Sequence, residues 1–160
     1  MISDEVASFL ESGVSILVGT RDDRLVPEAV RGCGAAVCAG GTELLVLVPE
    51  ATGAATVANL AANGRIAVTF SRPTDHRSLQ IKGRVLERRA AGDGERAIAD
   101  RYRCGFAQEL ALVGVPPRMT IRMAMWPAHA VRLAIAGVFV QTPGPGAGAT
   151  FGAVPGENAR

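Results

Sequence analysis

The sequence predicts a mainly β protein with flanking helices, in which a small antiparallel barrel carries the helices on its outside. Three observations support this fold class. Short stretches rich in Val, Ile and Leu recur along the chain, and several of them alternate with polar residues. Most of these stretches are separated by turn residues. Helical patterns occur at only three places, so the regular strand–helix alternation of a parallel sheet is absent.

The first third of the chain predicts one helix and three strands. Ser3 is suited to cap a helix whose apolar face comes from Val6, Phe9 and Leu10, and Gly13 lies just past its end. Glycines in the second strand allow a bend or a close approach of another backbone. The three strands are VSILVG (14–19), VPEAVRGCGAAVC (26–38) and ELLVLV (43–48).

The middle of the chain predicts a helix followed by two strands. A helical period covers 54–62 and ends at Asn63-Gly64, a strong helix stop. The strands RIAVTFS (65–71) and RSLQIKGRVLER (77–88) follow, with a polar turn between them.

A longer helix and two closing strands complete the predicted domain. Asp93 can cap the helix, its buried face recurs every fourth residue from Ile98 to Leu110, and Pro116-Pro117 ends it. RMTIRMAMW (118–126) and AHAVRLAI (128–135) predict the strands. We therefore assign 1–136 to one domain, and 137–160 to a Gly/Pro-rich C-terminal arm or tail.

Composition excludes several classes of function. The chain has 160 residues and a formal net charge of +2, too small to indicate a nucleic-acid or anionic-membrane partner. The three cysteines form no C-x-x-C pair, which favours a reducing interior over a disulfide framework or a zinc site. No signal peptide and no apolar run long enough to span a membrane is visible. We expect a cytoplasmic protein.

The strand at 77–88 carries the clearest candidate for a binding surface. Its side chains alternate, so that Ser78, Gln80, Lys82 and Arg84 share one face and apolar residues share the other. Lys82 is the only lysine among 17 basic residues. The polar face fits either solvent or a ligand with polar edges, and the sequence leaves both interpretations open.

Three further residues are candidates for contact with an anion. Arg31 lies in an otherwise apolar strand and needs either an anionic partner or access to water. Thr52 and Thr56 flank the start of the helix at 54–62, where free amides can hold a phosphate, although ordinary helix capping is the simpler explanation of Thr52.

Residues for catalysis are scarce. His76 and His129 are isolated, and no Ser–His–Asp order, HExxH motif or carboxylate pair occurs. An enzyme with this sequence would need a cofactor to carry its reaction.

The run ELLVLVPEATGAATVANLAANGRIAVTF (43–70), followed by HRSLQIKGRV (76–85), resembles the FMN-binding split-barrel family typified by pyridoxamine 5′-phosphate oxidase. The similarity covers residues 3–136 as element order and is most specific in LAANGRIAVTF (60–70). It implies a six-stranded antiparallel split barrel, a homodimer, and FMN at the subunit interface. The family also includes reductases that use flavin or deazaflavin, haem-handling proteins and members without known activity.

Residue by residue, the resemblance implies a weakened cofactor site. The family's second-strand arginine corresponds to Arg31, and its fifth-strand glutamine falls on Ser78, with Gln80 and Lys82 nearby. Its Ser-Arg-Lys grip on the FMN phosphate falls on Ala54, Ala55 and Thr56, so both cations are missing.

These observations lead to two hypotheses. The first is an FMN-binding homodimer, a small oxidoreductase of unidentified substrate, in which Arg31, Thr52, Thr56, Ser78, Gln80 and Lys82 hold the cofactor and no metal is used. The alternative is a non-catalytic binding module with a degenerate flavin site. Haem bound through His76 or His129 is a third option, which rests on the range of the family alone.

Overall fold

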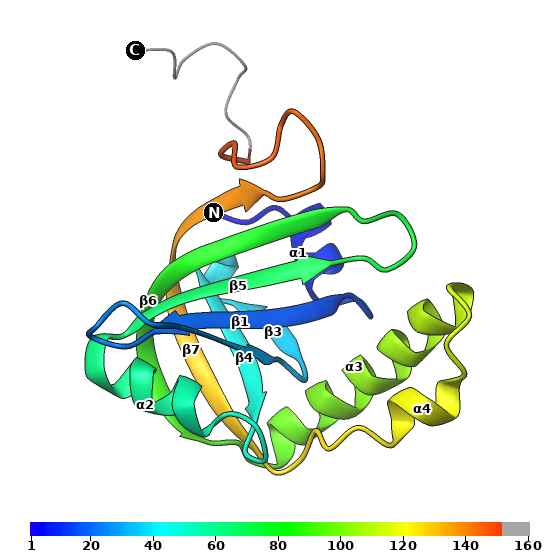
Figure 1. Ribbon diagram of the computed structural model, residues 1–160, viewed down its shortest axis with the longest axis horizontal. Helices are drawn as coiled ribbons and strands as arrows, with labels where there is room; N and C mark the ends of the chain where they lie inside the picture. The colour runs from blue at the N-terminus through cyan, green and yellow to red at the C-terminus, as the bar shows by residue number, and fades with distance from the viewer. Residues whose placement is uncertain (152–160) are drawn as a thin grey trace.

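The computed structural model describes residues 1–151 as one curved sheet with helices against it (Figure 1). The strands are continuous apolar or alternating segments, as expected from their β-branched content. In chain order the elements are α1 (Asp4–Leu10), β1 (Ser15–Arg21), β2 (Pro27–Arg31), β3 (Ala35–Cys38), the 3-10 turn η1 (Ala39–Gly41), β4 (Glu43–Pro49), α2 (Ala54–Asn63), β5 (Arg65–Ser71), β6 (Ser78–Ala90), α3 (Asp93–Leu112), α4 (Pro117–Ile121) and β7 (Ala128–Val140).

The sheet is antiparallel and has seven strands, in the order β2-β1-β5-β6-β7-β4-β3. The prediction of a mainly β, antiparallel fold with flanking helices is confirmed, but the expected count of six strands is wrong. The count of six came from the family resemblance, whereas the residue patterns predict seven strands; that total holds because 118–126 forms no strand while the predicted strand at 26–38 is divided in two. Its first part pairs with β1 and its second part pairs with β4.

The division of this strand joins the two edges of the sheet. Gly32 N donates to Ile16 O (3.0 Å), Cys33 N donates to Leu47 O (2.9 Å), and Leu47 N donates to Gly34 O (2.9 Å). A Cβ atom at Gly32 would lie 2.6 Å from an Ile16 methyl, so glycine permits this crossing. The segment between β2 and β3 therefore contacts β1 on one side and β4 on the other.

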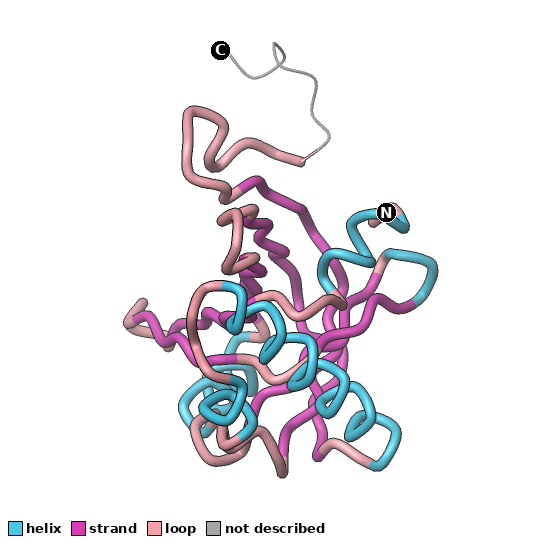
Figure 2. The backbone as a smooth tube through the Cα atoms, turned by 90° about the vertical axis from the view of Figure 1, so that its right-hand side faces the viewer, coloured by secondary structure: helices cyan, strands magenta, loops and turns pink. Residues whose placement is uncertain are grey.

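One face of the sheet forms the core, and the opposite face carries the polar residues. Fully buried side chains on the inner face include Val18, Phe70, Ile81 and Leu133. The helices lie at the edges of this arrangement, with α2 at one end of the sheet and α3 with α4 at the other (Figure 1), and the view of Figure 2 looks from the α3 and α4 end. Such an arrangement leaves much of the polar face free of helices.

A glycine contact fixes α3 against the start of β1. A Cβ atom at Gly13 would lie 2.1 Å from the carbonyl carbon of Gly105, and a Cβ atom at Gly105 would lie 3.2 Å from the Cα atom of Gly13. Phe106 and Tyr102 on the same helix are buried in the core. Glycine at both positions lets the helix approach the chain closely enough to bury these rings.

Two local predictions about helix starts differ from the structure. Asp93 lies in the first turn of α3, and Gly92 occupies the N-cap position. Glu95 accepts from the Gly92 amide (2.8 Å) and pairs with Arg89 (2.6 Å), so a carboxylate from inside the helix satisfies the terminus. The capping role considered for Thr52 falls instead on Gly53, which makes no side-chain cap.

The segment predicted as a strand at 118–126 is the short helix α4 and a loop. Pro117 occupies the first turn of this helix, where its missing amide hydrogen costs nothing. Thr120 points into the structure and is buried, whereas Met119 and Ile121 are 60% and 56% exposed. The alternation of apolar and polar residues in this segment therefore does not correspond to a β-strand.

Residues after 136 continue the sheet before they leave it. β7 passes through Gly137 to Val140, and Phe151 N donates to Val138 O (2.8 Å), so part of the expected arm folds back on the strand. The remainder of that expected arm, 152–160, lies outside the described residues. Within 1–151, no helix is long and apolar enough to cross a membrane.

Candidate functional site

A groove of about 890 Å³ lies on the polar face of the sheet, where β1, β2, β5 and β6 run side by side. Its floor is made of small residues, including Gly19, Ala29 and Ala67. A Cβ atom at Gly19 would meet only the Ala67 carbonyl oxygen, at 3.6 Å. Four cations surround this floor: Arg21, Arg65, Lys82 and Arg84.

Strand register explains why these residues meet. Gly19 lies opposite Ala67, and Ala67 lies opposite Lys82 across the β5–β6 pair. Arg65 lies directly opposite Arg84 on the same pair. Directly opposite residues of an antiparallel pair project from the same face, so both guanidinium groups project beside the groove.

A bulge shapes the wall formed by β7. Lys82 pairs with Gly137 and Gly83 pairs with Ile135, so Ala136 has no partner on β6 and lines the groove. A Cβ atom at Gly83 would lie 2.2 Å from the Ala134 carbonyl oxygen, which shows how closely the two backbones approach. β-Bulges commonly redirect side chains next to functional sites.

The four cations of the groove outnumber the one carboxylate in its lining, Glu28. Among residues 1–151, none of them forms an ion pair with a carboxylate. Arg84 donates to the Asn63 carbonyl oxygen (3.1 Å) and Arg21 to the Asp22 carbonyl oxygen (2.9 Å). Like charges directly opposite each other destabilise a sheet, so the facing pair Arg65 and Arg84 favours an anion between or above them.

Of the six residues predicted to hold a cofactor, Lys82 is the one that lines this groove. Gln80 and Ser78 lie further along the same face of β6 and bond to β5. Gln80 Nε2 donates to Thr69 Oγ1 (3.0 Å), and the hydroxyls of Ser78 and Ser71 lie 2.8 Å apart.

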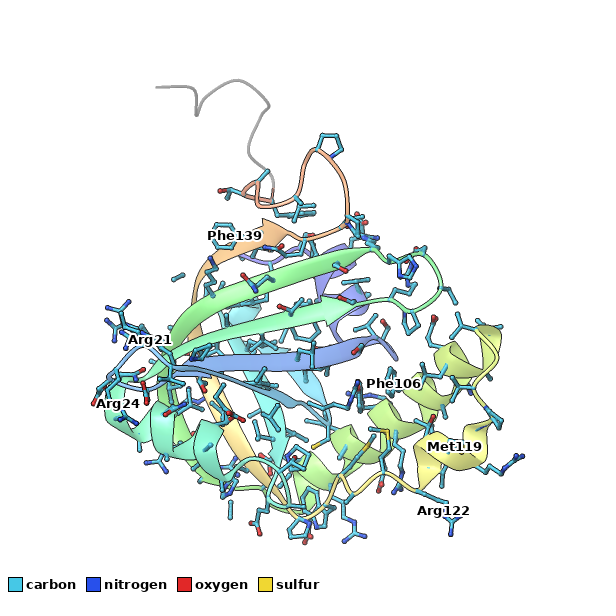
Figure 3. All side chains as sticks on the ribbon, in the orientation of Figure 1. Arg21, Arg24, Phe106, Met119, Arg122 and Phe139 are labelled. Atoms are coloured by element: carbon cyan, nitrogen blue, oxygen red, sulfur yellow. The ribbon has the colours of Figure 1, made fainter. Side chains whose placement is uncertain are left out.

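Arg31 lies at the other end of β1 from the groove. Its guanidinium donates to Ser15 Oγ (3.0 Å) and lies 5.4 Å from the ring centroid of Phe106 on α3. Figure 3 shows Phe106 well separated from Arg21, which lines the groove. Burial raises the pKa of the neighbouring Tyr102 hydroxyl above its usual range, and Arg31 opposes this shift.

The two threonines at the start of α2 also lie outside the lining of the groove. Thr52 is exposed in the preceding turn, whereas Thr56 is completely buried inside the helix. Thr56 Oγ1 has no hydrogen-bond partner among the described residues. The structure therefore does not bring Arg31, Thr52 or Thr56 together with Lys82.

Sequence reasoning missed Arg21 and Arg65 as candidates. A usable signal was present, because Arg65 and Arg84 become direct neighbours once the turn at 72–77 is taken as a hairpin. Arg21 offered no local signal, since it reaches the groove through pairing of β1 with β5, a strand more than forty residues later.

Within residues 1–151, the histidines and cysteines provide no second site. His76 is exposed in the β5–β6 turn, and His129 is half-buried at the start of β7. Burial raises the pKa of the Cys33 thiol to about 12, which leaves it protonated at neutral pH. No group of three or more metal-ligating side chains occurs in the described part of the chain.

Comparisons with known proteins show the fold. No protein-family model matches the chain, and no curated protein matches it in sequence. Many solved structures resemble it, including the three that follow. HupZ of Group A Streptococcus has a TM-score of 0.57 and 19% identity, covering 92% of this chain and 100% of that one. An F420 reductase has a TM-score of 0.55 and 17% identity, covering 86% and 98%. A putative pyridoxamine 5′-phosphate oxidase from Lactobacillus delbrueckii has a TM-score of 0.54 and 14% identity, covering 86% and 93%.

The chain therefore has the fold of these proteins, which include a putative pyridoxamine 5′-phosphate oxidase, and this agrees with the fold that its sequence resemblance implied. These identities all lie below 20%, so the likeness concerns the backbone.

Proposed function

We propose that the groove binds the phosphate end of a flavin-type cofactor, either FMN or a deazaflavin. The observation that carries this proposal is the set of four cations around one groove, none of them paired with a carboxylate within residues 1–151. The groove, at about 890 Å³, is within the usual range for a small-molecule site. An FMN-binding protein from Syntrophomonas wolfei also has this fold, which supports the choice of a flavin.

The cations suit a phosphate for distinct reasons. Arginine presents a planar fork that can bind two phosphate oxygens, whereas lysine supplies a compact charge on a flexible stem. Arg65 and Arg84 would take the first role, and Lys82 the second. These three residues would replace the family's cations that are missing at Ala55 and Thr56.

The bound flavin would supply hydride or electron transfer, and the chain would orient the cofactor and exclude water from part of it. We infer an oxidoreductase that acts in the cytoplasm as a homodimer with a split-barrel fold.

A spectrum of the purified protein, followed by titration with FMN, tests the proposal. We expect flavin absorbance or saturable quenching of FMN fluorescence, with weaker binding in Lys82→Ala and Arg65→Gln. Arg101→Gln is the matched control, because Arg101 is an exposed arginine on α3 without an ion-pair partner among the described residues. A colourless protein that neither quenches FMN nor is stabilised by it would refute a flavin site. It would favour the alternative of a non-catalytic module, which the missing cations at 54–56 also support.

A further inference from the structure

The ammonium of Lys82 rests on an aromatic ring. Its Nζ atom lies 4.6 Å from the ring centroid of Phe139 on β7, within the range of a cation–π contact. Phe139 pairs with Gln80, two residues before Lys82 on the same face of β6. Figure 3 shows the Phe139 ring at the end of β7, beside this face of the sheet.

Gly137 makes room for this ring. It pairs directly with Lys82, and a Cβ atom there would lie 3.0 Å from the Phe139 ring. The backbone of Gly137 has no positive φ angle, so conformational freedom does not explain the glycine. The absence of a side chain instead lets the ring lie against β7, below the lysine.

We propose that Phe139 is a positioning residue, which holds the Lys82 ammonium at the wall of the groove for an anionic ligand. The proposal rests on the proposed function, because the ligand in question is the phosphate of the flavin. Phe139 does not line the groove itself and acts through Lys82.

An aromatic ring serves this purpose differently from a carboxylate. A free lysine side chain occupies many rotamers, and binding a ligand in one of them has an entropic cost. A carboxylate partner would fix the side chain but would also compete with an incoming phosphate. The face of a phenyl ring attracts the ammonium without neutralising its charge. Lys82 is thus both fixed and available.

The single lysine of the chain makes the contact directly observable. With lysine labelled by ¹³C, the Cε and Hε signals report on one side chain, and the ring should shift the Hε signals upfield. We expect Phe139→Leu to move these signals toward the values of a free lysine, and Phe139→Trp to keep them shifted. Gly137→Ala should displace the ring and move the signals in the same direction as Phe139→Leu, even if one of the variants proves less stable.

A double-mutant cycle with FMN tests the consequence for binding. Phe139→Leu should weaken FMN binding about two- to fivefold, which corresponds to about 0.5–1 kcal/mol for an exposed cation–π contact. In the Lys82→Ala background the same change should have no further effect. Trp126→Leu removes the ring of another cation–π contact, in which the guanidinium carbon of Arg96 lies 5.6 Å from the Trp126 ring centroid. Neither residue lines the groove, so this variant should leave FMN binding unchanged.

The outcomes separate the two proposals. Lysine signals that do not move in Phe139→Leu, or an equal loss of FMN binding in the Lys82→Ala background, would overturn the positioning role. If the lysine signals move but the wild-type protein binds neither FMN nor inorganic phosphate, the proposed function fails while the contact that positions Lys82 stands.

Discussion

Replacing Arg65 with glutamine should change stability and ligand binding in opposite directions. Arg65 faces Arg84 directly across β5 and β6, and neither is paired with a carboxylate in the described part of the chain. Without ligand, the substitution removes a repulsion. With an anionic ligand present, it removes an attraction.

The expected magnitudes follow from this geometry. A directly opposite pair of like charges costs roughly 0.2–1 kcal/mol, so the ligand-free variant should melt about 1–4 °C higher than wild type. A charge-assisted hydrogen bond contributes roughly 1.5–3 kcal/mol, and solvent screening of the exposed Arg65 points to the lower end of that range. Affinity for FMN should therefore fall about tenfold.

Thermal melts at two salt concentrations, with and without FMN, provide the assay. The gain in ligand-free stability should be clear near 0.01 M salt, where the Debye length is about 30 Å, and should disappear near 1 M, where it is about 3 Å. Arg101→Gln should show neither effect. An Arg65→Gln variant that is less stable at low salt, with unchanged affinity for FMN, would refute the proposal that Arg65 and Arg84 bind an anion.

Three further predictions concern the fold and its titrating groups. Gly13→Ala should lower the free energy of unfolding by about 1–3 kcal/mol or more because its Cβ would overlap the backbone of α3, whereas Gly94→Ala, with nothing within 4 Å, should be neutral or stabilising in chemical denaturation. Cys33 should resist an aromatic disulfide reagent at neutral pH while the exposed Cys104 reacts, because burial raises the Cys33 pKa to about 12; rapid modification of both thiols in the native state would contradict this. The arginine partner and the helix N-terminus lower the pKa of Glu95 to about 2, so its contribution to stability should be complete above about pH 4.5 and lost as the pH falls toward 2. Glu95→Gln should accordingly lower the melting temperature at pH 7 but not near pH 2.

The sequence predicts most of the strands because their signals are local. RIAVTFS and LQIKGRV alternate between apolar and polar residues, and the structure buries the apolar set of each, including Phe70 and Ile81. The helix at 54–62 was predictable from its stop, since Gly64 has the left-handed conformation that ends α2. The prediction failed at 118–126, where Pro117 starts a helical turn and tertiary packing of Thr120 overrides a strand-like alternation.

The groove was less predictable because its residues come from separate strands. Lys82 was identified from its place in one alternating strand, but Arg21 and Arg65 reach it only through the strand order β1-β5-β6. Ala136 lines the groove because of a bulge in β7, and no residue type in the sequence predicts that bulge. Local patterns therefore predict which face of the sheet is polar. The position of the cations on that face depends on the register of β1, β5 and β6.

The crossing between β2 and β3 also bears on the behaviour of the protein at high concentration. Unpaired strand edges are the usual templates for edge-to-edge association and aggregation. Here the two edge strands, β2 and β3, are consecutive in the chain. The residues between them, 32–34, already form backbone hydrogen bonds with β1 and β4. We therefore expect this junction to protect the native state from recruiting strands of neighbouring molecules. A larger side chain at Gly32, which would collide with Ile16, should expose both edges together and convert a local packing defect into a tendency to aggregate.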